Sequence, residues 1–255
     1  VSQVVCSGTP EYGKIIEAAR AGLEKVRVRG LSVRLLRWFL FRLLLPSRGM
    51  PPLAGGLTRL YQKTWMGNAA KRLGLVPAKL ARLEPLMPEA PPLAAMRLLP
   101  REVPPLGEER SRVAFSGGCL QSALFGEVNR AAVRVLAANG ARVAFPAAQT
   151  CCGALQAHAG DRETARLLAR RNLEAINPDD FDAVVLAGAG CGAMLHEYGD
   201  LLEQEPVLAE RARAFGDKVM DITVFLARNG VRPSNHPDPQ CVAYDHACHL
   251  LHALK

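Results

Sequence analysis

Four cysteines between residues 119 and 191 each follow a stretch that the sequence predicts to be a short strand. They are Cys119, Cys151, Cys152 and Cys191. In open parallel α/β sheets, the loops at the carboxyl ends of the strands converge on one crevice. We therefore expect these four thiols to meet at one edge of a parallel sheet.

The chain from residue 113 onwards alternates short apolar runs with amphipathic stretches, which is typical of βαβ units in a parallel α/β sheet. The expected helix before Asn139-Gly140 ends at a standard stop signal, and Asp161 is a plausible N-cap for the next helix. We predict strands at 113–116, 141–145, 182–186 and 241–244, and helices at 125–138, 161–176 and 222–229. The predicted fold class is α/β.

A basic, proline-rich segment precedes this region. Residues 31–45 are strongly apolar but contain Arg34, Arg37 and Arg42, and they end at Pro46. Such a stretch is shorter than the roughly 20 residues that a membrane-spanning helix needs, and its arginines would be costly inside a bilayer. It is either an interfacial or subunit-docking helix, or a core helix whose arginines snorkel outward.

The rest of this segment is interrupted by prolines, so that only short helices fit, with candidates at 58–63 and 77–86. Arginine and lysine crowd the first hundred residues of a chain whose formal net charge is +8. A basic region of this kind suits an acidic partner surface, such as another subunit, anionic lipid or nucleic acid, but it is also compatible with a solvated helix face.

One strand and its cysteine loop occur twice. Residues 113–119 and 242–248 share Val, Ala, an aromatic residue and Cys at identical spacing, 129 positions apart. This period suggests a duplicated domain rather than a solenoid. We expect a second unit to begin at residues 236–255 and to continue beyond Lys255, and the start of the chain also looks cut.

Cysteine usage indicates a reduced intracellular compartment, because seven cysteines in 255 residues are too sparse for a disulfide-stapled scaffold. Thiolates are the usual ligands of iron-sulfur clusters and of structural zinc. Separate buried cysteines that act as small hydrophobes are the alternative, but packing explains poorly why Cys151 and Cys152 are adjacent in a glycine-bounded loop. Cys241 is expected to be a core residue of its strand.

The pattern of Cys119, then Cys151-Cys152-Gly153, then Cys191 resembles the CCG cysteine-rich domain of heterodisulfide reductase-like proteins. The family's paired motifs bind a noncubane iron-sulfur cluster or act in thiol chemistry. Its last element is often Cys-x-x-Cys, whereas Met194 stands three residues after Cys191 here.

The amino-acid sequences of several motifs more closely resemble the family of glycolate oxidase iron-sulfur subunits. These motifs are TCCGALQAHAG at 150–160, AGCGAMLHEYG at 189–199, YDHACHLLH at 244–252 and LTRLYQK at 57–63. Residues 6–13, CSGTPEYG, are similar to the end of that family's second ferredoxin motif, although Ser7 replaces the usual proline. The resemblance covers nearly the whole chain.

This resemblance implies four parts. Residues 1–30 would be the remnant of a ferredoxin-type 4Fe-4S domain with the following helix, 31–112 the basic helical connector, 113–235 the first CCG domain and 236–255 the start of a second. The ligands of an iron-sulfur cluster of 4Fe-4S type would be Cys119, Cys151, Cys152, Cys191 and Cys248, with Cys6 as an orphan ligand of a ferredoxin cluster.

The resemblance also implies an oxidoreductase subunit with no catalytic residue of its own. Flavin-binding glycolate oxidase subunits carrying FAD would oxidise glycolate to glyoxylate, and this chain would relay the electrons toward a quinone-type acceptor. The expected location is cytoplasmic or peripheral on the inner face of the cell membrane, with no nucleic-acid partner.

Three alternatives stay open. The first is an iron-sulfur subunit of lactate utilisation or of anaerobic glycerol-3-phosphate dehydrogenase, which shares the CCG plan. The second is a zinc-stabilised interaction module, favoured by histidines near Cys248. The third is a disulfide reductase that uses Cys151 and Cys152 as a redox pair, which predicts an exposed thiol of low pKa.

Overall fold

The central sheet explains how distant cysteine loops come together. The computed structural model describes residues 12–47, 49–74, 76–92 and 100–232, and positions 241 and 243. Within these residues the sheet has the order β1-β3-β2-β4-β5, formed by β1 (Glu102–Val103), β2 (Ser111–Ser116), β3 (Ala141–Ala144), β4 (Ala183–Leu186) and β5 (Val219–Asp221). All neighbouring strands are parallel except the pair of β1 and β3. The predicted α/β class is confirmed.

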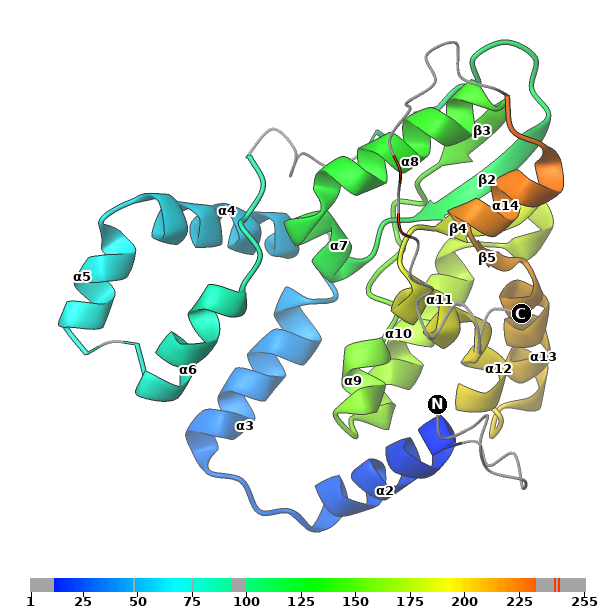
Figure 1. Ribbon diagram of the computed structural model, residues 1–255. Helices are drawn as coiled ribbons and strands as arrows, with labels where there is room; N and C mark the ends of the chain where they lie inside the picture. The colour runs from blue at the N-terminus through cyan, green and yellow to red at the C-terminus, as the bar shows by residue number, and fades with distance from the viewer. Residues whose placement is uncertain are drawn as a thin grey trace.

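Helices cover both faces of this sheet (Figure 1). One face carries α8 (Gly126–Ala138) and α14 (Ile222–Asn229), and the other carries α10 (Arg162–Ala175), α11 (Ala189–His196), α12 (Tyr198–Leu201) and α13 (Pro206–Asp217). The alternation of side chains along each strand separates the two layers, because Val113 and Phe115 pack under α8 whereas Ala114 packs toward α10. Both layers are therefore buried, as a parallel sheet requires.

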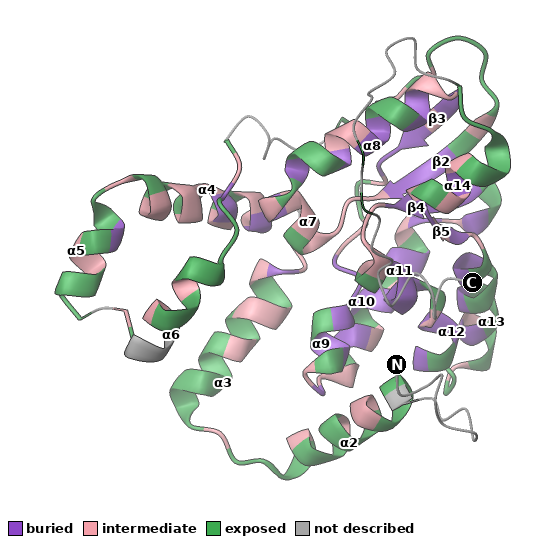
Figure 2. Cartoon of the chain, in the orientation of Figure 1, coloured by how far each residue is buried: buried purple, intermediate pink, exposed green. Residues whose placement is uncertain are grey.

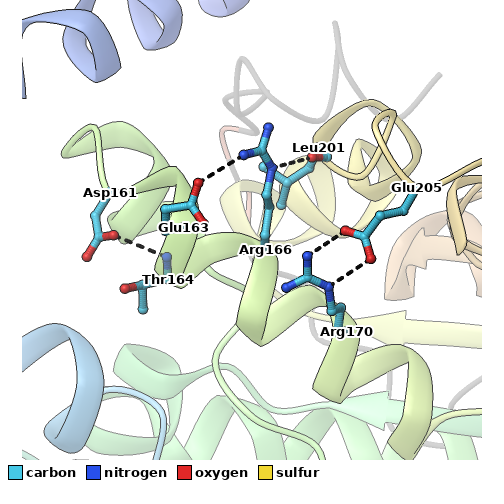
Figure 3. A network of polar contacts seen from close by, with 7 residues as sticks. All are labelled: Asp161, Glu163, Thr164, Arg166, Arg170, Leu201 and Glu205. Carbon is cyan, nitrogen blue, oxygen red and sulfur yellow. Dashed lines mark hydrogen bonds and ion pairs between the residues drawn. The ribbon is translucent and has the colours of Figure 1, made fainter. Parts of the chain in front are cut away.

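The predicted helix boundaries follow from local chemistry. Helix α8 ends at Ala138 with Asn139 as its C-cap, and Gly140 adopts a positive φ of 87°. Asp161 caps α10, since its Oδ1 accepts a hydrogen bond from the backbone N–H of Thr164 at 3.1 Å. Figure 3 shows this cap together with the ion pair of Arg170 and Glu205, which ties α10 to the start of α13.

A chain of helices extends from the α/β body (Figure 1). We call α2 (Tyr12–Val26), α3 (Leu31–Trp38), the π-helical segment Phe39–Leu44, α4 (Met50–Lys63), α5 (Met66–Arg72) and α6 (Ala78–Leu83) the helical arm. A short 3-10 turn, Glu84–Leu86, ends it. The helices from Leu31 onward confirm the helical character of the predicted connector, whose bounds stay a prediction, and α4 packs against α7 (Cys119–Leu124) of the body.

The alternative of a buried core helix at residues 31–45 is wrong. Helix α3 contains no buried residue, and Trp38 remains 54% exposed. Only Leu45, at the end of this stretch, is buried. Figure 2 shows the contrast between the largely exposed arm and the buried strands. The physical reason is that, among the described residues, most apolar side chains of α3 pack against no other layer.

Two details of the C-terminal prediction need correction. Cys241 is exposed rather than a core residue, and neither Cys241 nor Ala243 lies in a strand. Neither residue pairs with the edge of the described sheet, and a strand requires such pairing for its backbone hydrogen bonds. The remaining positions of the expected second unit, Cys248 included, lie outside the described residues, as does Cys6. Among the described residues, no helix combines the length and apolarity needed to cross a bilayer.

Candidate metal centre

The four cysteines that follow the strands come from three loops. Cys119 is the first residue of α7, Cys151 and Cys152 precede α9 (Ala154–His158), and Cys191 lies in the first turn of α11. All four line one pocket of about 290 Å³ at the carboxyl edge of β2 and β4. Their expected convergence is confirmed, whereas their role as ligands stays a prediction.

The thiols differ in how far they are buried. Cys151 is 3% exposed and Cys152 is 5% exposed, whereas Cys119 and Cys191 are half-buried. The Sγ atoms of Cys119 and Cys151 are 3.4 Å apart, which brings residues 32 positions apart in sequence into direct contact. The adjacent pair thus forms the protected floor of the pocket.

Hydrogen bonds between neighbouring thiols divide them into two kinds. The pKa of Cys151 is lowered because its thiolate accepts hydrogen bonds from Cys119 and then from Cys152, and the pKa of Cys191 is lowered because Cys152 donates to it. The same contacts raise the pKa of the donors Cys119 and Cys152, and burial adds to the increase. The pocket therefore favours negative charge on two sulfurs.

A buried polar network holds the backbone of the adjacent cysteines. Asn172, which is 2% exposed, accepts a hydrogen bond from the N–H of Thr150 at 2.7 Å and donates to the carbonyl of Cys151 at 3.1 Å. Its Nδ2 also donates to the hydroxyl of Tyr198 at 2.9 Å, and that hydroxyl donates to the carbonyl of Cys152 at 2.8 Å. Two fully satisfied side chains thus fix this loop.

Gln156 connects the same loop to the helical arm. The carbonyl of Phe41 has no partner within its helix, because Pro46 has no N–H and the N–H of Leu45 donates to the carbonyl of Leu40. Gln156 Nε2 donates a hydrogen bond to this free carbonyl at 3.1 Å. The Oε1 atom of Gln156 lies 3.8 Å from Cys151 Sγ. Gln156 is fully buried, so one side chain bridges the π-helical segment and a pocket thiol.

Gly153 ends the adjacent cysteine pair in a left-handed conformation with φ of 88°. A Cβ atom there would lie 3.3 Å from the Cα of Ala165. We expect Gly153→Ala to lower the free energy of unfolding by about 1 to 3 kcal/mol, measured by chemical denaturation. Gly190→Ala, which meets open space inside a helix beside Cys191, should be neutral or stabilising, and equal losses in the two variants would contradict this explanation.

His158, the last residue of α9, contacts the helical arm through an interaction that depends on pH. Its Nδ1 lies 2.8 Å from Glu17 Oε1 on α2, and this carboxylate raises the pKa of His158. The stabilisation should therefore be complete below the ordinary histidine pKa of about 6.5 and be lost as the pH rises through the raised value. Thermal unfolding of wild type and the Glu17→Gln variant should be measured from acidic to alkaline pH. The variant should be less stable than wild type at the acidic end only, and a stability difference that does not change with pH would refute the contact.

The donor set around the pocket fits an iron-sulfur group. Four sulfurs are available, the backbone N–H groups of Leu120 and Gly153 bond to Cys119 and Cys151, and the volume exceeds that of a single ion. Within the described ranges, no three His, Cys, Asp or Glu side chains are grouped closely enough to share one metal ion. Cys6 and Cys248 lie outside those ranges.

The sequence analysis did not find Asn172, Tyr198 and Gln156. The available signal was an asparagine among the apolar residues Leu168 and Leu173 on one face of α10. A polar residue on a core-facing stripe requires a partner, but the pattern does not say which one. His196, for which no ligand role was predicted, faces the carbonyl of Gly216 with its Nδ1 at 3.0 Å.

Comparison with known proteins supports the assignment of both regions. Residues 113–196 match a family model described as the CCG cysteine-rich domain. Residues 32–87 match a model of the linker region of the glycolate oxidase iron-sulfur subunit. The two matches correspond to the α/β body around the pocket and to the helical arm from α3 onward.

Curated relatives extend the similarity. The probable glycolate oxidase iron-sulfur subunit of Bacillus subtilis is 33% identical over 98% of this chain and 57% of its own length. The glycolate oxidase iron-sulfur subunit of Escherichia coli is 28% identical over 99% of this chain and 58% of its own length. Lactate utilization protein A of Halalkalibacterium halodurans is 32% identical over 53% of this chain and 55% of its own length.

The chain thus spans slightly more than half the length of these relatives. No solved structure matches it at comparable significance. Residues 113–196 therefore belong to the CCG cysteine-rich domain family, and the chain as a whole is similar to the iron-sulfur subunits of glycolate oxidases.

Proposed function

We propose that the chain is part of the iron-sulfur subunit of a glycolate oxidase or dehydrogenase complex. In this function it relays electrons from a flavin subunit, which oxidises glycolate to glyoxylate, toward a quinone-type acceptor. The observation that carries the proposal is that four thiols surround one pocket in a CCG domain, which is joined to a linker typical of glycolate oxidase iron-sulfur subunits. The substrate chemistry belongs to the flavin subunit with its FAD.

The proposed ligands of the pocket are Cys119, Cys151, Cys152 and Cys191. Cys248 is proposed as a further ligand, and Cys6 as a ligand of a ferredoxin-type 4Fe-4S cluster. A cluster held there would accept and release single electrons. The pKa of two of the four thiols, Cys151 and Cys191, is lowered, which shifts them toward the thiolate, the form that binds metal. The other two would release protons on binding, so loading should be favoured at higher pH.

The chain's own residues would make the pocket suitable for electron transfer. Burial of Cys151 and Cys152 keeps water from the floor of the pocket, and the hydrogen bonds of Asn172 and Tyr198 hold their backbone in place. The N–H of Gly153 donates toward Cys151 Sγ. Donors to a ligating sulfur raise the reduction potential by stabilising negative charge, and burial opposes this effect.

The proposed organisation follows the resemblance. Residues 1–30 are assigned to the end of a ferredoxin-type domain, 31–112 to the connector, 113–235 to the first CCG domain and 236–255 to the start of a second. The flavin subunits are the proposed partners. We place the complex in the cytoplasm, peripherally on the inner face of the membrane, because an exposed basic helix suits an acidic surface.

A second candidate is a lactate utilisation protein, because lactate utilization protein A matches the CCG portion. The match to the linker of the glycolate oxidase subunit favours glycolate. The disulfide reductase alternative predicts a thiol that is both exposed and acidic. Cys151 has the lowered pKa, at about 4, but it is 3% exposed, so only one of these two conditions holds.

Anaerobic mixing of the full-length protein and its flavin subunits with glycolate tests the proposed function. We expect reduced iron-sulfur signals in the electron paramagnetic resonance spectrum within one turnover. L-lactate and glycerol 3-phosphate serve as comparison substrates in matched samples. Reduction by either of these, with none by glycolate, would reject the glycolate assignment and leave the electron relay in place.

A further inference from the structure

A second, larger pocket lies next to the turn that follows α9. It encloses about 860 Å³ between α2, α3 and the start of α10. This volume falls within the range of ligand pockets in proteins, which is roughly 300 to 1,000 Å³. None of the four pocket cysteines lines it, so we call it the arm pocket to separate it from the metal centre.

Helix α3 and its π-helical continuation give the arm pocket an amphiphilic wall. The wall contains Leu31, Arg34, Leu35, Trp38 and Arg42. Except for the adjacent pair Arg34 and Leu35, successive members are three or four residues apart in sequence, so they share one helix face. Leu31 is 70% exposed and Leu35 is 58% exposed. Basic and apolar groups thus alternate along a face that the described structure leaves largely uncovered.

Basic side chains outnumber acidic ones around the arm pocket, and most of the acidic ones are engaged. Glu24 pairs with Arg29 and Arg37, Glu163 pairs with Arg166, and Asp161 caps α10. Figure 3 shows the contacts of Asp161, Glu163 and Arg166. Glu203 is the remaining acidic residue of the lining.

Three arginines remain available for an anion. The side chains of Arg34, Arg42 and Arg162 make no hydrogen bond or ion pair among the described residues, and Arg162 Nε is shielded from solvent without a partner there. A buried guanidinium nitrogen without a partner is costly, and a bound anionic oxygen would satisfy it. The pocket thus combines unpaired guanidinium groups with exposed apolar side chains.

We propose that the arm pocket binds the headgroup of an acidic phospholipid, with the phosphate on Arg34, Arg42 and Arg162 and the acyl chains along Leu31, Leu35 and Trp38. Guanidinium groups bind phosphate oxygens by paired hydrogen bonds, and tryptophan favours the membrane interface. The inference deepens the proposed peripheral location and does not depend on the electron relay.

Vesicle flotation of the full-length, cluster-containing protein tests the site. Binding to mixed phosphatidylcholine and phosphatidylglycerol vesicles should exceed binding to phosphatidylcholine alone and should fall with salt. The variant Arg34→Gln, Arg42→Gln, Arg162→Gln should weaken this binding about 100-fold. The matched control is Arg134→Gln, Arg171→Gln, Arg228→Gln, which removes the same charge from exposed positions outside the arm pocket and should bind nearly as well as wild type.

A second variant separates a lipid from a free anion. Trp38→Ser should weaken vesicle binding and leave the binding of inorganic phosphate unchanged. Binding of phosphate without binding of vesicles would overturn the lipid assignment, as would equal losses in the two arginine variants. A third outcome would also overturn the lipid assignment: wild type binds no vesicles, and the arginine variant loses binding to the flavin subunits. The partner of the arm pocket would then be an acidic protein surface. Iron-sulfur signals should persist in every variant, so failure of this proposal is distinguishable from failure of the electron relay.

Discussion

Asn172→Leu is expected to cause the largest loss of stability of any single change proposed for this chain. The substitution keeps the branching and the number of heavy atoms of the side chain. It leaves the N–H of Thr150 and the carbonyl of Cys151 without their partner, and it removes one of the two hydrogen bonds of the Tyr198 hydroxyl. Each buried group left unsatisfied costs about 1 to 3 kcal/mol, so the free energy of unfolding should fall by about 3 kcal/mol or more. This is a large part of the roughly 5 to 15 kcal/mol that stabilises a typical domain.

Chemical denaturation of the two proteins measures this loss. Asn177→Leu is the matched control, because Asn177 is partly exposed and its side chain makes no capping hydrogen bond. We expect the control to change the unfolding free energy by less than about 1 kcal/mol. Similar losses for both variants would show that the network around the adjacent cysteines does not contribute as the hydrogen bonds indicate.

Replacing both adjacent cysteines has the second large expected effect. In the variant Cys151→Ser, Cys152→Ser, two of the four pocket sulfurs are removed, including one whose lowered pKa favours metal binding. We expect complete loss of one component of the electron paramagnetic resonance spectrum of the full-length protein, with a matching fall in iron and acid-labile sulfide.

Cys241→Ser provides the control for this variant, because Cys241 is exposed and does not line the pocket. It should retain every spectral component. The ligand assignment fails if the double variant retains all components, or if the control loses the same component. Serine differs little from cysteine in size, so both variants are expected to fold.

The α/β body was predictable because its signals are local. Strand β4 is a short run of buried apolar residues, and Asp161 and Gly140 mark helix ends through their own backbone chemistry. The convergence of the cysteines followed from strand direction alone. Strands β1 and β5 were missed because they have two and three residues, too few to show a periodic pattern.

Other features depend on contacts that the local pattern does not contain. The same amphipathic spacing at residues 31–45 suits a core helix and a surface helix, and only the exposure of α3 among the described residues decides for the surface. Helix α4 begins before the expected position 58 because Pro51 and Pro52 occupy its first turn, where a missing N–H costs little. The network of Asn172 and Tyr198 joins residues 26 positions apart, and no periodicity reveals such a pair.

The most direct test of the central claim is metal and acid-labile sulfide analysis of the full-length protein, purified without oxygen and examined by electron paramagnetic resonance. The proposed function predicts iron and sulfide together, with a spectral component that disappears in the Cys151→Ser, Cys152→Ser variant. Zinc without acid-labile sulfide would contradict the electron relay and would identify the chain as a zinc-stabilised interaction module.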